Sequence, residues 1–250
     1  MMEMPELVPE KYEEIYKYFR DFEPNKRLQD FGFAVMHSLY KSEVHYTDES
    51  SQTIQDHLAD GGSLILSPNH QSNADTPTIA GLACEDTFAA IKGTTIIPAK
   101  ADMFGWPILG KFFPHMMAHP VFRSKDFSDD TNGRLLRNEV VNNLINFNID
   151  HINKGGNIAI FPEATRNKVN PSEVRKLKKG IGRIAVGVDD PSKLLIATMG
   201  FAYRLKHLKL RPLVVIGEPF SPTGMVQDEV LEETRRRMQI ATTEAFELAG

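Results

Sequence analysis

The stretch 61–78, GGSLILSPNHQSNADTPT, decides the fold that the sequence predicts. After a glycine turn, residues 61–67 form a short apolar run of the kind that is buried in a sheet. Polar residues end the run, and a helix is expected from Thr78, with Asp75 or Thr76 placed to cap it. A strand that passes through a polar loop into a helix is the repeating unit of an α/β fold.

The rest of the chain continues this alternation. Helices are expected over 10–22, 26–41, 131–153 and 173–188, and strands over 94–98, 157–161, 194–203 and 212–216. The pattern predicts one α/β domain with a mostly parallel or mixed central sheet flanked by helices. We expect residues 42–250 to form this domain and residues 1–41 to form a helical N-terminal extension, which caps the core or lies on a membrane surface.

Composition sets the broad class. The chain has 250 residues, of which 41% are hydrophobic and 25% charged, as in a soluble globular protein. No apolar run approaches the roughly 18 residues that a membrane-spanning helix requires. The acidic start lacks the features of a secretory signal. The single cysteine, Cys84, excludes an intrachain disulfide and fits a reducing compartment. We therefore expect a cytoplasmic protein, attached at most to the inner surface of a membrane.

Charge is distributed unevenly along the chain. Residues 1–60 carry thirteen acids and six Lys or Arg, whereas residues 173–211 carry ten Lys or Arg and three acids. The basic segment is either a solvated face or a surface for a phosphate-bearing partner. It has no interleaved aromatic residues and matches no recognition motif, so nucleic acid is not an expected partner.

Two polar stretches carry the candidate chemistry. A neutral His70 can accept a proton from a hydroxyl near pH 7, and Asp75 can orient the ring and stabilise the imidazolium that forms. The alternative is turn chemistry, with Asp75 as a helix cap. In FPEATR, Glu163 and Arg166 either pair with each other or hold a polar, phosphate-bearing substrate, because the guanidinium fork matches phosphate oxygens.

Together these stretches resemble a known family. NHQSNAD resembles the NHx4D block of the glycerolipid acyltransferases, especially the 1-acylglycerol-3-phosphate acyltransferases, and FPEATR resembles their FPEGTR block. Further similar blocks are AKADMFGWPILG (99–110), PVFR (120–123) and LKKGIGRIAVG (177–187). Residues 42–250 would then be an acyltransferase domain.

The resemblance implies the reaction and the role of each residue. A fatty acyl group would pass from acyl-CoA or acyl-carrier protein, as co-substrate, to the sn-2 hydroxyl of 1-acylglycerol 3-phosphate (lysophosphatidate). His70 would be the general base and Asp75 its orienting partner, with no metal and no other cofactor. Glu163, Thr165 and Arg166 would shape the acceptor site. Arg123 and Lys100 would hold the phosphate.

Alternatives stay open at this point. The acceptor could be glycerol 3-phosphate or another lysophospholipid, and an inactive lipid-binding module is a rival of another class. Ala164 stands where the family usually has glycine, which bears on acceptor and acyl specificity. The apolar segment FGWPILGKFFPHMM (104–117) is either core, the lining of an acyl tunnel, or a membrane contact.

Overall fold

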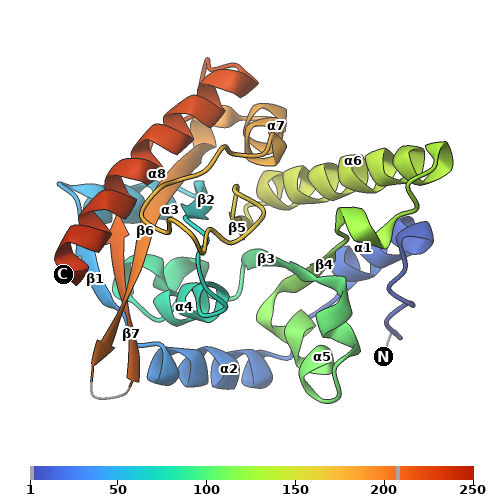
Figure 1. Ribbon diagram of the computed structural model, residues 1–250, viewed down its shortest axis with the longest axis horizontal. Coiled ribbons are helices and arrows are strands. Elements are labelled where there is room, and N and C mark those ends of the chain that lie inside the picture. The colour runs from blue at the N-terminus through green and yellow to red at the C-terminus, as the bar shows by residue number, and fades with distance from the viewer. Residues whose placement is uncertain (1–2, 207–208) are drawn as a thin grey trace.

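The computed structural model describes residues 3–206 and 209–250, and these form a seven-stranded sheet flanked by helices (Figure 1). The strands lie in the order β1-β7-β6-β2-β5-β3-β4, and all pairs are parallel except β6 with β7. The predicted fold class is therefore confirmed. The strand bounds are β1 Glu43–Tyr46, β2 Ser63–Pro68, β3 Thr95–Lys100, β4 Ala118–Val121, β5 Asn157–Ala159, β6 Leu194–Lys206 and β7 Lys209–Ile216.

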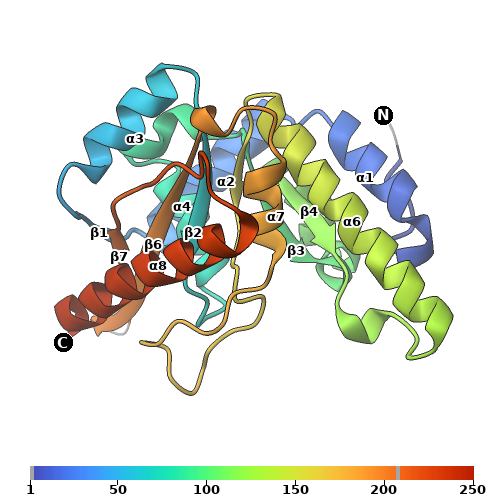
Figure 2. The ribbon, with the colours of Figure 1, turned by 90° about the horizontal axis from the view of Figure 1, so that it is seen from above.

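Helices cover both faces of the sheet. Figure 2 shows α6, α7 and α8 on one side of the strands and α3 and α4 on the other. The α-helices are α1 Tyr12–Asp21, α2 Lys26–Leu39, α3 Ser50–Ala59, α4 Asp75–Leu82, α5 Leu109–Phe112, α6 Thr131–Asn153, α7 Gly180–Gly187 and α8 Gln227–Ala249. Short 3-10 helices are η1 Pro9–Lys11, η2 Asp86–Ile91, η3 Ala101–Gly105, η4 Phe113–Met116, η5 Ser124–Asp126 and η6 Pro191–Lys193.

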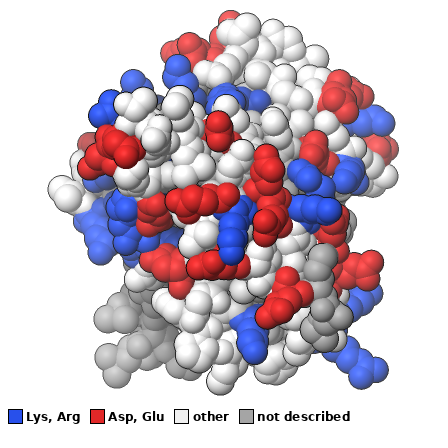
Figure 3. Space-filling model, turned by 90° about the vertical axis from the view of Figure 1, so that its right-hand side faces the viewer, with Lys and Arg blue, Asp and Glu red and all other residues white. Residues whose placement is uncertain are grey.

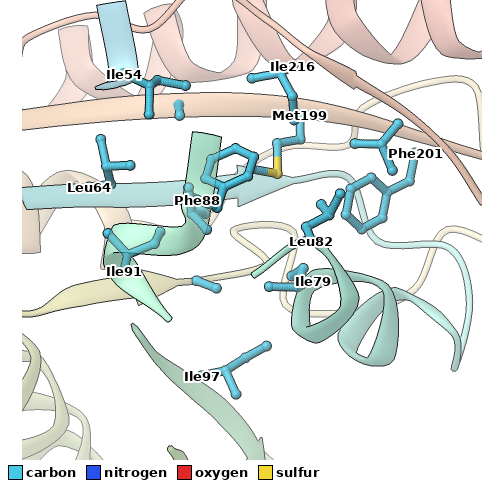
Figure 4. Packing of buried hydrophobic residues seen from close by; sticks show 14 of the residues in the cluster. Ile54, Leu64, Ile79, Leu82, Phe88, Ile91, Ile97, Met199, Phe201 and Ile216 are labelled. Atoms are coloured by element: carbon cyan, nitrogen blue, oxygen red, sulfur yellow. The ribbon is translucent and has the colours of Figure 1, made fainter. Parts of the chain in front are cut away.

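The central strand β2 shows why the core has two halves. Successive side chains of a strand point to opposite faces of the sheet. Leu64 and Leu66 accordingly pack with α3, α4 and η2, whereas Ile65 packs with α6 and α7. Figure 4 shows the first half, where Phe88 and Met199 lie among aliphatic side chains. Because both faces are covered, β2 is buried along its whole length, with the apolar run Leu64, Ile65 and Leu66 at its centre.

Several sequence expectations need correction. The basic helix expected over 173–188 is helical only in α7, and residues 162–179 form a long loop. Asp75 does not cap α4: the N-cap position is Ala74, without a side-chain cap bond, and Asp75 is the first helical residue. Strands β1 and β4 and helices α3 and α8 were not predicted. The helix over 131–153 is confirmed, since it is α6.

The parallel strands bring the polar loops to one edge. His70 follows β2, Glu163 follows β5, Lys100 ends β3 and Arg123 follows β4. Because β2, β5, β3 and β4 are consecutive in the sheet and parallel, these residues all lie at the carboxyl ends of adjacent strands. Ligands of open α/β sheets bind at this edge.

Three further observations concern the helices and the charged surface. No helix within residues 3–206 and 209–250 is long and apolar enough to cross a bilayer. On the side drawn in Figure 3, acidic and basic side chains are interspersed. An ion pair between Arg20 and Asp150, 3.1 Å apart, joins α1 to α6.

Candidate active site

The loop after β2 brings a histidine and a carboxylate into direct contact. His70 Nδ1 lies 2.7 Å from Asp75 Oδ2. Because an ionised carboxylate only accepts hydrogen bonds, Nδ1 carries the proton and Nε2 keeps its lone pair. Within the described part of the chain, Nε2 has no hydrogen-bond partner. The imidazole is therefore the tautomer that a general base requires.

Asp75 is fully buried and carries four hydrogen bonds. Its Oδ2 accepts bonds from the ring of His70 and, at 2.8 Å each, from the backbone N–H groups of Gln71 and Ser72. Its Oδ1 accepts a bond from the hydroxyl of Tyr203 at 2.6 Å. A buried carboxylate is stable as an anion only when such donors surround it. The side chain is thus turned back toward its own loop instead of capping α4.

The loop after β5 holds the backbone of His70 from both sides. The His70 N–H donates to Glu163 Oε1 at 2.9 Å, and the His70 carbonyl accepts a bond from the N–H of Asn167 at 2.7 Å. The other oxygen of Glu163 accepts a bond from the N–H of Arg175 at 3.1 Å. Glu163 is 3% exposed, and both of its oxygens face backbone donors. It orders the two loops and does not line the cavity beside His70.

The aromatic ring of Phe161 packs against the imidazole ring of His70. The two ring centroids lie 4.3 Å apart with an interplanar angle of 30°. A little further along the same loop, Ala164 has a φ of +59°, which is the left-handed region that favours glycine. Glycine at this position would relieve the strain that the Cβ of Ala164 causes.

An apolar cavity of about 340 Å³ opens beside His70. Its walls come from α2, α4, η2, β3 and the segment 103–116, so it extends from the polar loops into the first half of the core. The apolar side chains of its wall include Phe33, Met36, Ile79, Leu82, Phe88, Ile91, Ile97, Met103, Phe112, Phe113, Met116 and Phe161. An apolar cavity with a few polar groups at one end is the common form of a small-molecule site.

The other predicted site residues divide between two places. Lys100 and Arg166 line the cavity together with His70. Thr165 is exposed and lies outside its wall. Arg123 lines a neighbouring open hollow of about 580 Å³, where its guanidinium donates to Asp102 Oδ2 at 2.6 Å. The structure therefore brings His70, Asp75, Lys100 and Arg166 together and leaves Arg123 apart.

Two groups of the site were missed from the sequence. Asn69 is buried: its Oδ1 accepts the N–H of Phe201 at 2.7 Å and its amide donates to the Phe201 carbonyl at 3.2 Å. Its place beside His70 in the NHx4D block was the available signal. Tyr203 stands 128 positions from its partner Asp75, and no local pattern marks it.

The fold and site define the class: an α/β protein with a histidine–carboxylate pair and an apolar cavity at the carboxyl edge of its sheet. A family model described as Acyltransferase matches residues 46–201, which is more than half of the chain, and the protein belongs to this family. No curated protein matches the chain. The matched segment includes both polar loops and ends two residues before Tyr203.

Proposed function

We propose that the protein transfers a fatty acyl group from an acyl-CoA or acyl-carrier-protein thioester to the sn-2 hydroxyl of 1-acylglycerol 3-phosphate, which yields phosphatidic acid. The resemblance of its motif blocks to 1-acylglycerol-3-phosphate acyltransferases supports this acceptor. One structural observation carries the proposal. The ring nitrogen left free by the His70–Asp75 bond belongs to a side chain that lines the apolar cavity.

The reaction follows from these groups. His70 Nε2 removes the hydroxyl proton as the acceptor oxygen attacks the thioester carbonyl, and Asp75 stabilises the imidazolium that results. The tetrahedral intermediate then collapses, the carbon–sulfur bond breaks, and His70 returns the proton to the departing thiolate. The thioester is already activated, so the step needs no covalent acyl-enzyme. The acyl chain would occupy the cavity.

Cations at the polar end of the cavity fit a phosphate-bearing acceptor. Lys100 and Arg166 both lie in its wall, and the Arg166 guanidinium donates to Asn73 Oδ1. A dianionic phosphate gains charge-assisted hydrogen bonds from such groups. Arg123 would join them only after it leaves Asp102, and Thr165 would contact the acceptor only at the surface.

The experiment is thiol release from palmitoyl-CoA by the purified protein, with lysophosphatidate, glycerol 3-phosphate or no acceptor. We expect release with lysophosphatidate that falls by roughly 10²- to 10⁴-fold in His70→Ala, the range of general acid–base catalysis. His45→Ala is the matched control, because His45 is a surface histidine of the edge strand β1. Activity retained in His70→Ala would contradict the mechanism.

The acceptor arms separate the rival functions. Release with glycerol 3-phosphate would keep the chemistry and replace the acceptor. Release without any acceptor would indicate a thioester hydrolase. Lipid binding without turnover, with carrier-protein donors also tested, would favour a lipid-binding module.

We further propose that the protein works on the inner surface of a membrane. Exposed apolar side chains gather on α2 and on the loop before α5, which lie side by side at the bottom of Figure 1. Phe31 is 65% exposed, Trp106 50% and Ile108 83%. Ile108 has a φ of +64°, a conformation that is costly for a β-branched residue. This patch adjoins the segment that lines the cavity, so a chain leaving a bilayer would have a short path to His70.

Co-sedimentation with liposomes tests the surface. Trp106→Ala and Ile108→Ser should each weaken binding, since each removes an apolar group from the interface. Val226→Ser is the control, because Val226 is 62% exposed and immediately precedes α8. The end of α8 opposite the C-terminus lies at the top of Figure 1, away from α2 and α5. Unchanged liposome binding by both patch variants would contradict the membrane proposal.

A further inference from the structure

Strand β6 extends beyond its neighbour on one side. Its pairing with β2 ends where Met199 meets Pro68, whereas its pairing with β7 continues to Lys206. The overhanging residues therefore lie beside the loop that follows β2, which carries His70. Because side chains alternate along a strand, Phe201 and Tyr203 point to the same side.

This overhang is fastened to the histidine loop at three places. The backbone of Phe201 exchanges two hydrogen bonds with the amide of Asn69. The side chain of Gln71 donates to the Phe201 carbonyl. Two residues further along β6, the hydroxyl of Tyr203 donates to Asp75 Oδ1 at 2.6 Å. The first two contacts set the position of the strand, so the third is made at a defined distance.

The two carboxylate oxygens of Asp75 accept different numbers of hydrogen bonds. Oδ2 accepts three bonds, from the His70 ring and two backbone N–H groups. Among the described residues, Tyr203 is the donor to Oδ1. Since Asp75 is fully buried, water cannot replace that donor. The hydrogen bond from Tyr203 to Oδ1 therefore affects how strongly the Asp75 carboxylate, through Oδ2, stabilises a positive charge on the His70 ring.

We propose that Tyr203 is a positioning residue of the acyl transfer: its hydroxyl fixes the Asp75 carboxylate and sets the basicity of His70 through it. This inference rests on the proposed function. Tyr203 acts as a hydrogen-bond donor and touches neither substrate nor reacting atoms.

Tyr203 is suited to stay a donor. Burial, and then the neighbouring Asp75 carboxylate, raise the pKa of Tyr203 far above its ordinary value. The phenol is therefore protonated at every pH at which the enzyme would work. The hydroxyl of Thr78, 3.4 Å from Tyr203 Oη, lies on the other side of it at the long limit of a hydrogen bond.

Removal of this donor should shift the midpoint of the His70 titration in a definite direction. Without Tyr203 Oη, the negative charge of Asp75 concentrates toward Oδ2 and holds the His70 imidazolium more strongly. The Tyr203→Phe variant should therefore raise the midpoint of the His70 titration by ~0.5–1 pH unit, the scale of one charge-assisted hydrogen bond. The acid limb of the rate profile should move upward by the same amount, and kcat on the plateau should fall ~3- to 10-fold with KM nearly unchanged, because Asp75 is held less firmly.

The test measures both quantities on the full chain. Histidine ring NMR over pH 5–9, with His70→Asn used to assign the signal, gives the titration midpoint, and thiol release gives kcat and KM. Tyr16→Phe is the matched control, because it removes another buried hydroxyl. This hydroxyl donates to the Pro120 carbonyl over a distance of 3.3 Å and makes no contact with His70. An unchanged midpoint and acid limb in Tyr203→Phe would overturn the proposal and leave the tyrosine as packing.

A second variant covers the case in which Tyr203→Phe does not fold. Site-specific 3-fluorotyrosine at position 203 keeps the shape and makes the hydroxyl a stronger donor, so the His70 midpoint should move downward. A midpoint that stays or rises would contradict the proposed coupling. The NMR titration needs no turnover. A wild type without transfer activity would therefore overturn the proposed function, while the midpoint still decides whether Tyr203 acts on His70.

Discussion

Glu163 accepts a hydrogen bond from the backbone N–H of His70 at 2.9 Å, across 93 positions of sequence. The two most recognisable motifs of the chain are therefore joined by the carboxylate of one and the backbone of the other. Because the second oxygen of Glu163 binds the Arg175 N–H, one buried side chain ties the histidine loop to both ends of the loop that follows β5. In this arrangement Glu163 orders the site, whereas Arg166 and Lys100 line the cavity beside His70.

Glu163→Gln tests this ordering role. An amide offers one oxygen where the carboxylate offers two, so one of the two backbone N–H groups is left buried and unpaired. The cost is about 1–3 kcal/mol of folding stability. We expect a lower midpoint in urea denaturation together with a lower kcat, since His70 is then less firmly held.

The matched control is Glu173→Gln, an exposed acid of the same loop, which should change neither quantity. If Glu163→Gln raised the KM for the acceptor and left stability and kcat as they were, Glu163 would be a substrate ligand and our reading of its contacts would fail.

Asp75→Asn separates charge from geometry at the pair. The amide oxygen can accept the same three bonds as Oδ2, and the amide N–H can donate to Tyr203 Oη, so the fold should persist. A neutral amide stabilises the His70 imidazolium far less, and transfer should fall roughly 10²- to 10³-fold. The double variant with His70→Ala should be no slower than His70→Ala alone, because the two residues act as a unit. Additive losses in rate assays would show that they act independently.

Ala164→Gly should stabilise the protein. At a φ of +59° a Cβ costs about 1–2 kcal/mol. The greater freedom of glycine in the unfolded chain offsets about 0.5–1 kcal/mol of this, so the net gain in folding stability is up to about 1.5 kcal/mol. Chemical denaturation measures it. Ala90→Gly is the control, since Ala90 is exposed and lies outside the positive-φ set; it should lose stability. A loss of stability in Ala164→Gly would contradict the strain argument.

Ala99→Phe tests the occupant of the cavity. Ala99 lies in the wall on β3, on the same face as Ile97, and a phenyl ring there would fill part of the 340 Å³. Transfer from palmitoyl-CoA should slow by at least roughly tenfold, whereas transfer from a short-chain thioester should change little, because a site that loses a few methylene contacts changes rates by ~10- to 200-fold. Ala89→Phe, exposed on η2 and outside the wall, is the control. Equal effects on long and short donors would place the acyl chain elsewhere.

His119 gives the fold a pH dependence. Its ring is 1% exposed on β4, neither nitrogen has a hydrogen-bond partner among the described residues, and burial lowers the pKa of His119 to about 3. The unfolded chain takes up this proton near pH 6.5, which the folded chain cannot do. Stability is therefore complete above about pH 6.5 and is lost as the pH falls toward 3. Between pH 7 and pH 5 the loss should be about 2 kcal/mol.

Urea denaturation of the wild type and of His119→Leu at pH 7 and pH 5 measures how much His119 contributes to the pH dependence of the folding stability. The variant should lose about 2 kcal/mol less than the wild type on going from pH 7 to pH 5. His151, whose pKa is also lowered by burial, is present in both proteins, so the difference reports His119. Parallel losses would mean that His119 titrates normally in the folded state.

Local sequence by itself determined the α/β class, the strand β2, the helix α6 and the pair His70–Asp75. The reason is that hydrophobic periodicity, glycine turns and a five-residue separation are all properties of short segments. The same reasoning failed for 173–188, because tertiary contacts hold the first half of that segment as a loop: Val174 and Leu177 pack against Met238 of α8. The backbone N–H groups of Val174 and Arg175 bond to Gln239 and Glu163 instead of to a helical turn.

Tertiary structure alone decided which groups complete the site. Glu163 meets the backbone of His70 and Tyr203 meets Asp75 because β5 and β6 flank β2 in the sheet, an order that no local pattern encodes. Arg123 lies apart because Asp102, at the start of η3, holds its guanidinium. Burial then sets the chemistry: a carboxylate removed from water must find its donors wherever the fold brings them, and here they come from positions 70, 71, 72 and 203.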